Sequence, residues 1–107
     1  MGLINAVLSV QGEHPIEHCG LVLLTIPQAI TVVLAAKVNG VGVLGIEAFE
    51  YRDNVRPLMD WIADYSSSVK EVGFVNSSCS AALCFLDKLT IFWSGNSQHV
   101  FVELVLA

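Results

Sequence analysis

The chain has 107 residues, of which 54% are hydrophobic and 14% are charged, and its formal net charge is −5. This length accommodates one hydrophobic core, so we expect a single domain over residues 1–107. Five basic residues against ten acidic ones exclude the basic patch that nucleic-acid binding needs. The hydrophobic share excludes disorder and predicts apolar surface that a second copy or another partner covers.

The cysteine count and the N-terminal residues indicate in which cellular compartment the protein resides. Three cysteines, an odd number, argue against a disulfide framework and favour reduced thiols, so we expect a cytoplasmic protein without a secretory signal. Residues 19–36 carry no charge and approach the length of a membrane span. Pro27-Gln28 interrupts them, however, and two strands joined by a turn explain the stretch better. We therefore expect no membrane association.

The N-terminal third reads as strands around one polar loop. Residues 3–10 are almost wholly apolar and predict a strand. Residues 11–20 predict a loop with one helical turn after Pro15. Residues 21–26 form a short β-type run that Pro27 ends, because proline cannot donate to a sheet ladder.

A hairpin is expected next. Residues 30–38 and 41–51 predict two strands, and Asn39-Gly40 between them is typical of a type I′ turn, which needs positive φ at both central residues. Gly42 and Gly45 in the second arm indicate a bulge or the close approach of another backbone.

Residues 53–65 predict the principal helix. Asp53 or Asn54 can cap it, and Pro57 in the first turn lacks an N–H that would be unpaired there anyway. Apolar side chains recur at helical spacing and form one stripe, made of Val55, Leu58, Met59, Ile62 and Tyr65. Trp61 lies to one side of this stripe and is a candidate contact residue.

The remainder reads as a three-strand meander. Residues 69–75 are ambiguous between strand and loop, residues 76–78 predict a turn, and residues 80–86 predict a strand. Asp87-Lys88 then leads into a hairpin whose arms are residues 88–93 and 99–107. Strands and helix do not alternate, so we expect an α+β domain: an antiparallel sheet of five to six strands with one principal helix packed on it.

Aromatic residues on both faces of this C-terminal hairpin suggest a binding surface. Phe92 and Trp93 point to opposite faces of the first arm, and Phe101 shares the polar face of the second arm with His99 and Glu103. Both faces are therefore expected to be covered, by the helix, a second subunit or a partner. The predicted binding residues are Trp61, Trp93, Phe101, His99 and Glu103.

The densest group of metal-ligand residue types is His14, Glu17, His18 and Cys19. Two histidines four residues apart on a helix could share a metal ion with the neighbouring carboxylate or thiol. His14 precedes a proline, which disfavours helical geometry, and zinc sites usually bring a second ligand cluster. A solvated loop is the better interpretation, and we expect neither a metal nor a cofactor.

Two thiol–imidazole pairs can be drawn from the sequence. Cys19 with His18, or Cys84 with His99, could act as a nucleophile with its base. Neither pair comes with a third orienting group, an oxyanion-hole signature or the local motif of a Cys-His enzyme family.

Two further patterns suggest chemistry but have plainer explanations. Asp60 and Asp64, one helical turn apart, could act as acid and base in a cleft, but Arg56 one turn earlier favours an ordinary charged surface. Residues 40–45 match G-x-G-x-x-G, but a strand is expected after them where a phosphate site needs a helix N-terminus. We therefore predict no catalytic residue.

From Ile30 onward the layout resembles the small immunity proteins of bacterial polymorphic-toxin systems, especially the WapI-like group. Three segments carry the resemblance: residues 38–42, an apolar strand ending in glycines; residues 56–62, with Leu58 and Trp61-Ile62; and residues 97–104, a polar turn followed by His99-Val100. The resemblance implies a cytoplasmic protein that blocks a cognate toxin by binding it.

Two function hypotheses from different classes follow. The first is a non-enzymatic binding protein, immunity-like in form, that acts as a homodimer and whose acidic charge suits a basic protein partner. The alternative is a small-ligand-binding or enzymatic α+β domain with an apolar pocket between sheet and helix, lined by Trp61, Trp93 and Cys84. Convergence of His99 and Glu103 in a cavity would favour the alternative, and a filled core would favour the first.

Overall fold

The computed structural model describes residues 2–107, which form a five-stranded antiparallel sheet and three α-helices. The strand order is β1-β2-β5-β3-β4. The elements in chain order are α1 (Gly2–Val10), β1 (Ile16–His18), β2 (Leu21–Thr25), α2 (Ile26–Val38), β3 (Val43–Tyr51), β4 (Val55–Asp64), a 3-10 turn (Ser66–Ser68), α3 (Phe74–Phe92), a second 3-10 turn (Ser97–His99) and β5 (Val100–Leu106). The predicted α+β class with an antiparallel sheet is confirmed.

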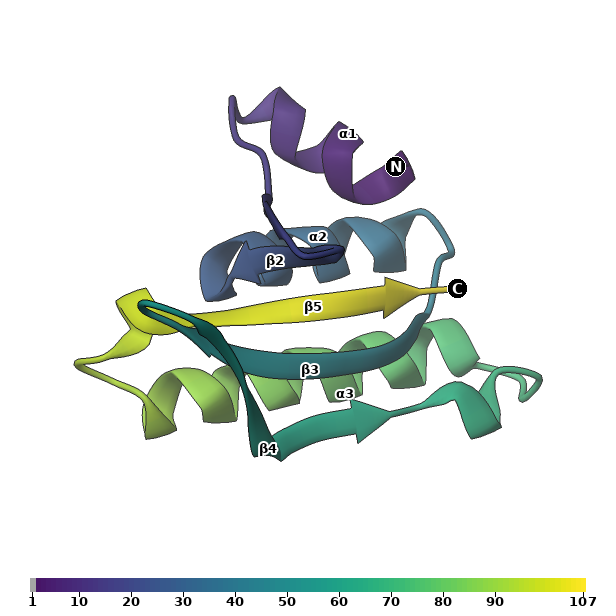
Figure 1. The fold of residues 1–107 in the computed structure, drawn as a ribbon. Helices are drawn as coiled ribbons and strands as arrows, with labels where there is room; N and C mark the ends of the chain where they lie inside the picture. The colour runs from purple at the N-terminus through teal and green to yellow at the C-terminus, as the bar shows by residue number, and fades with distance from the viewer. Residues whose placement is uncertain (1) are drawn as a thin grey trace.

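The sheet is made of two interleaved units. In each unit a helix joins two parallel strands, and a strand of the other unit lies between those two: β5 between β2 and β3, and β3 between β4 and β5. Both connecting helices, α2 and α3, lie behind the sheet in Figure 1 and contact each other. The opposite face of the sheet is left open over β5, β3 and β4.

The core fills the layer between the sheet and the two helices. Strand β5 turns Val100, Val102 and Leu104 inward, and the register places Ala48 opposite Val102 and Ile46 opposite Leu104. The fully buried helical residues facing them are Ala29, Val32, Val33 and Ala36 of α2 and Cys79, Ala82, Leu86 and Leu89 of α3. Helix α1 packs on α2 beside the β2 end of the sheet and adds buried Leu8.

Residues 26–38 form helix α2, so the predicted strand over residues 30–38 is wrong. Thr25 and Gln28 form a capping box at its start, and Pro27 lies in the first turn, where a missing N–H does no harm. At its end Gly40 has a φ of +72°, and the Val41 N–H donates to the Ala36 carbonyl over 2.8 Å. Asn39-Gly40 is thus a helix C-cap of the Schellman type rather than a hairpin turn.

Residues 74–92 form helix α3, which replaces the turn at residues 76–78 and the strands predicted over residues 80–86 and 88–93. Its buried residues recur with helical spacing, at positions 74, 78, 79, 82, 86 and 89. The predicted strand over residues 3–10 is likewise helical, because Leu3, Ile4, Val7 and Leu8 share the face that packs on the core.

Residues 55–64 form the edge strand β4, so the predicted helix over residues 53–65 is wrong. The pairing of β3 with β4 shifts between Glu47, opposite Ile62, and Phe49, opposite Pro57. This irregularity spaces the half-buried residues of β4 at positions 55, 58, 61 and 63, which imitates a helical stripe. The principal helix of the domain is therefore α3, the longest of the three among the described residues.

The C-terminal strand is confirmed, but its partners differ from the prediction. β5 pairs with β2 and β3, because residues 88–93, its expected hairpin arm, belong to helix α3. The predicted bulge is present, since the pairing of β3 with β5 shifts between Val43 and Gly45. At Gly42 the close neighbour is a side chain rather than a backbone: a Cβ there would lie 2.4 Å from the ring of Phe74.

Candidate binding surface on the open sheet face

The face of the sheet opposite α2 and α3 is open over β5, β3 and β4, and α1 borders it at the β2 end, where Ile4 and Asn5 line a cavity with Glu103. We define the open face by Glu47 of β3, Ile62 of β4, and Phe101, Glu103 and Val105 of β5. The register places Glu103 and Ile62 on either side of Glu47, so all three point to one side. Ile62 and Val105 are about half exposed, at 47% and 50%.

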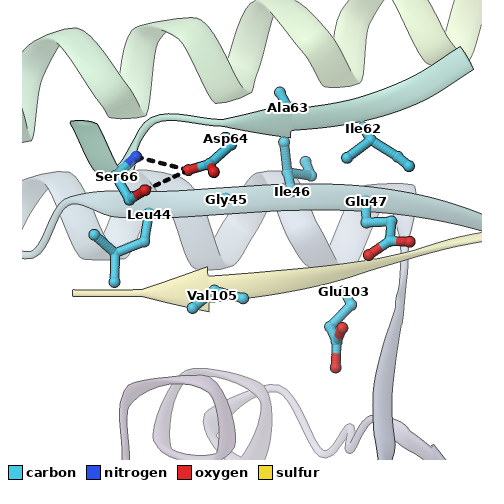
Figure 2. Close-up of a pocket in the computed structure, with 10 residues that line it drawn as sticks. All are labelled: Leu44, Gly45, Ile46, Glu47, Ile62, Ala63, Asp64, Ser66, Glu103 and Val105. Atoms are coloured by element: carbon cyan, nitrogen blue, oxygen red, sulfur yellow. Dashed lines mark hydrogen bonds between the residues drawn. The ribbon is translucent and has the colours of Figure 1, made fainter. Parts of the chain in front are cut away.

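Figure 2 shows a shallow cavity of about 310 Å³ on this face. Gly45 of β3 lines it, and a Cβ at this position would lie 3.3 Å from the Ala63 carbonyl oxygen of β4. Glu47 and Glu103 project from neighbouring strands at one end of the cavity. The full lining is Leu44, Gly45, Ile46, Glu47, Ile62, Ala63, Asp64, Ser66, Glu103 and Val105.

Glu47 and Glu103 are like charges placed directly opposite each other. Neither forms a salt bridge with any residue between 2 and 107. Partial burial raises the pKa of the Glu103 carboxyl, a hydrogen bond from the Val22 backbone lowers it, and the negative charge of Glu47 raises it further. The face thus carries negative charge that its own neighbours do not neutralise.

Asp64, the other carboxylate on the cavity wall, has a local structural role. Its Oδ1 accepts hydrogen bonds from the Ser66 N–H over 2.9 Å and from the Ser66 hydroxyl over 2.6 Å. These bonds lower the pKa of Asp64 and hold the turn that follows β4 (Figure 2). Asp64 and Asp60 lie on a strand and not one helical turn apart, so the predicted shared helix face is wrong.

The open face continues toward the β3–β4 turn as a row of rings. The Phe101 and Tyr51 ring centroids are 5.9 Å apart, and those of Tyr51 and His18 are 5.3 Å apart. Beyond this row, Glu50 forms salt bridges with Arg52 and Arg56, which lower the pKa of its carboxyl. The cations of the β3–β4 turn are therefore engaged there and do not reach Glu47 or Glu103.

A second group of aromatic side chains lies at the β4 edge of the sheet, between β4 and the C-terminal end of α3. We call it the aromatic patch and define it by Trp61, Phe85, Phe92 and Trp93. The Trp61 ring is 5.7 Å from that of Phe85 and 5.5 Å from that of Phe92, which in turn is 5.7 Å from Trp93. The Trp93 Nε1 atom is buried and finds no hydrogen-bond partner among residues 2–107.

A third surface feature is an apolar pocket of about 380 Å³ where the start of α2 meets the start of β5. Its lining is Thr25, Ile26, Pro27, Ile30, Thr90, Gln98, Val100 and Phe101. The alternative hypothesis expected such a pocket between sheet and helix, but lined by Trp61, Trp93 and Cys84. Trp61 and Cys84 instead line a separate cavity between β4 and α3.

Four of the five predicted binding residues fall into two places. Trp61 and Trp93 meet in the aromatic patch, whereas Phe101 and Glu103 lie on the open face. His99 ends the 3-10 turn before β5, about 13 Å from Glu103 along an extended strand, so the two do not converge in a cavity. Sequence reasoning missed Glu47, because its position opposite Glu103 depends on a register that no local pattern encodes.

The predicted chemical candidates remain dispersed. Among residues 2–107 no three His, Cys, Asp or Glu side chains lie close enough to hold a metal ion. His14, Glu17 and Cys19 are exposed around the short strand β1, and His18 stacks on Tyr51. Cys84 is exposed on α3, whereas His99 ends the 3-10 turn before β5. Gly40 caps a helix and faces no phosphate site.

Comparisons with protein-family models, with curated proteins and with solved structures find no match for this chain. Within residues 2–107, every helix is too short or too polar to cross a lipid bilayer.

Proposed function

We propose that this chain is a non-enzymatic binding protein whose open face docks a basic segment of another protein. The observation that carries the proposal is the pair Glu47 and Glu103, placed opposite each other on the open sheet face and without a salt bridge to any residue between 2 and 107. A lysine or arginine from a partner would neutralise both carboxylates at once.

The surroundings of the two carboxylates support a protein partner. Apolar Ile62 and Val105 flank them, and Phe101 extends the surface toward Tyr51. A charged centre with aromatic and aliphatic neighbours suits a partner segment that alternates cationic and apolar side chains. A second copy of this chain would bring Glu47 and Glu103 against their own likes, so self-association through this face is disfavoured.

The resemblance to immunity proteins gives the proposal its particular form. The partner would then be a bacterial toxin in the cytoplasm, and the acidic face would cover a basic surface that the toxin uses on its own target. Acidic charge also speeds the encounter with such a partner at low salt, which suits an inhibitor that must act quickly.

Selection from a library of displayed random peptides tests the proposal. Peptides selected on the unaltered chain should be enriched in Lys and Arg, and their amide shift changes in ¹⁵N NMR should fall on β3 and β5. The double variant Glu47→Gln/Glu103→Gln should bind them at least about tenfold more weakly. The control Asp53→Asn/Glu71→Gln removes the same charge at exposed positions elsewhere and should retain most of the affinity. Neutral or acidic peptides, or shifts confined to other elements, would refute the proposal.

The apolar pocket supports a second candidate function, the binding of a small apolar ligand. Its size lies in the usual range for ligand sites, and most of its lining is aliphatic or aromatic. Anilinonaphthalene sulfonate, a dye for apolar pockets, should shift the amides of Ile30 and Val100 at one-to-one stoichiometry. Ile30→Trp, which fills the pocket, should abolish the shifts, and unchanged binding by this variant would exclude the pocket as the site.

A further inference from the structure

The aromatic patch exposes more apolar surface than its packing within the chain requires. Phe92 is 69% exposed although its ring contacts Trp61 and Trp93, and its neighbour Ile91 is 68% exposed. Large exposed aromatic residues that already rest on other rings are typical of association surfaces, because the rings are held in place before the partner arrives.

The outward side of α3 extends this patch along the helix. Cys84, Lys88 and Phe92 lie four residues apart and therefore share one face. Cys84 and Lys88 line a cavity of about 340 Å³ together with Asp60 and Trp61 of β4. An acidic and a basic residue, Asp60 and Lys88, thus line the same cavity, and within residues 2–107 neither forms a salt bridge.

We propose that the aromatic patch is the surface through which two copies of this chain associate about a twofold axis. A twofold interface requires a surface that is complementary to itself. Asp60 on β4 and Lys88 on α3 meet this requirement, because rotation brings Asp60 of one copy to Lys88 of the other on both sides of the axis. Phe92 of each copy then covers the cavity of the other.

The other exposed surfaces suit a second copy less well. The edge strand β1 has three residues, and the edge strand β4 carries Pro57, a break in register and the charges of Arg56 and Asp60. These are features by which proteins prevent pairing of sheet edges. Pairing through the open face would place the carboxylates of Glu47 and Glu103 against their own copies. The association of copies does not depend on what the open face binds.

Sedimentation velocity over a range of protein concentrations tests this proposal. The unaltered chain should form a reversible dimer, and Phe92→Ser should raise its dissociation constant more than about tenfold. Val38→Ser is the matched control: Val38 is 86% exposed and lies at the end of α2, near the opposite end of α3. This control should leave the dissociation constant unchanged.

Charge exchange tests the same interface without removing an aromatic ring. Asp60→Lys and Lys88→Asp should each weaken the dimer, and the double variant should restore it, because the exchanged charges again meet across the axis. A bis-maleimide should join two copies through Cys84 and not through Cys19, which lies beside β1. A chain that stays monomeric, a dimer insensitive to Phe92→Ser, or a double variant as weak as the single ones would overturn the proposal.

Discussion

At the scale of single residues, the chain is tightly constrained where β3 enters the core beside α3. The Ser78 hydroxyl accepts a hydrogen bond from the Val43 N–H over 3.0 Å, and Ser78 is 3% exposed. Gly42 lies against the Phe74 ring and Ser78 in the same place. A small polar residue on α3 therefore satisfies a backbone donor where the helix approaches the strand closely.

Replacing Ser78 should be costly because it leaves that donor without a partner. We expect Ser78→Ala to lower the free energy of unfolding by about 1–3 kcal/mol in urea denaturation. Ser80→Ala on the exposed side of the same helix is the control, and it should change stability by less than about 0.5 kcal/mol. Equal effects of the two substitutions would show that the Val43 bond contributes little.

Glu103 should affect stability and binding in opposite directions. Because its folded pKa is raised, the folded state holds the proton more tightly than the unfolded state, so its contribution to stability falls as pH rises from the ordinary carboxyl value to the raised one. Glu103→Gln should therefore raise the free energy of unfolding at pH 7 by a few tenths to about 1 kcal/mol. The same substitution should lower the affinity for a basic partner. The stability gain should vanish below about pH 4, where both states are protonated.

Urea denaturation of Glu103→Gln at several pH values measures this effect. Glu71→Gln is the control, since Glu71 is exposed and its replacement should change the free energy of unfolding by less than about 0.5 kcal/mol. If Glu103 instead stabilises the fold, Glu103→Gln should lower the free energy of unfolding at pH 7.

At the scale of elements, helix α2 shows how local signals act together. The side chain of Thr25 accepts from the Gln28 N–H over 3.1 Å, and the Gln28 side chain accepts from the Thr25 N–H over 3.0 Å. The helix then buries β-branched residues such as Val32 and Val33, whose intrinsic preference is for strands. Caps and core burial together outweigh that preference.

The start of α2 should depend on this capping box. We expect Thr25→Ala to lower the free energy of unfolding by about 1 kcal/mol in thermal or urea denaturation. Thr31→Ala is the control on the same helix: the Thr31 hydroxyl only donates back to the Pro27 carbonyl, so its loss should be nearly neutral. A larger effect at Thr31 than at Thr25 would contradict this account of the helix start.

At the scale of the whole molecule, the interleaved sheet ties distant segments together. Strand β5 lies in the middle of the sheet, although it is the last strand along the chain, and it contributes three buried residues to the core. β2 and β3 pair with β5 and not with each other. The five-stranded sheet therefore cannot form until β5 pairs with both β2 and β3.

Removing residues 100–107 should abolish cooperative folding. The expected result is loss of amide dispersion in NMR spectra and of a sigmoidal unfolding transition. The reason is that β2 and β3 lose their pairing partner and the core loses the buried side chains of β5. Removing residues 2–10 should instead lower stability while the dispersion of sheet amides is retained, since α1 packs beside the sheet. A truncated chain that lacks β5 and still unfolds cooperatively would refute this view of the topology.

The sequence alone determined the class of the fold and those elements whose patterns are unambiguous. The short run over residues 21–26 predicts β2 and the alternation over residues 99–107 predicts β5, and the region of β3 is predicted with its glycine irregularities. Phe101 and Glu103 were expected on one face of β5, and the register confirms it. These predictions succeeded because alternating burial is a property of each strand by itself.

The other elements depend on packing and strand register, which no local pattern specifies. Apolar segments such as residues 3–10 and 30–38 fit strand and helix alike, and burial against the sheet selects the helix. The irregular pairing of β4 gives a strand the spacing of a helical stripe. The opposition of Glu47 to Glu103, and the contact of Trp61 with Phe92, join residues more than 30 positions apart. Local sequence patterns do not specify such pairs, because strand register and side-chain packing are fixed only when the whole sheet assembles.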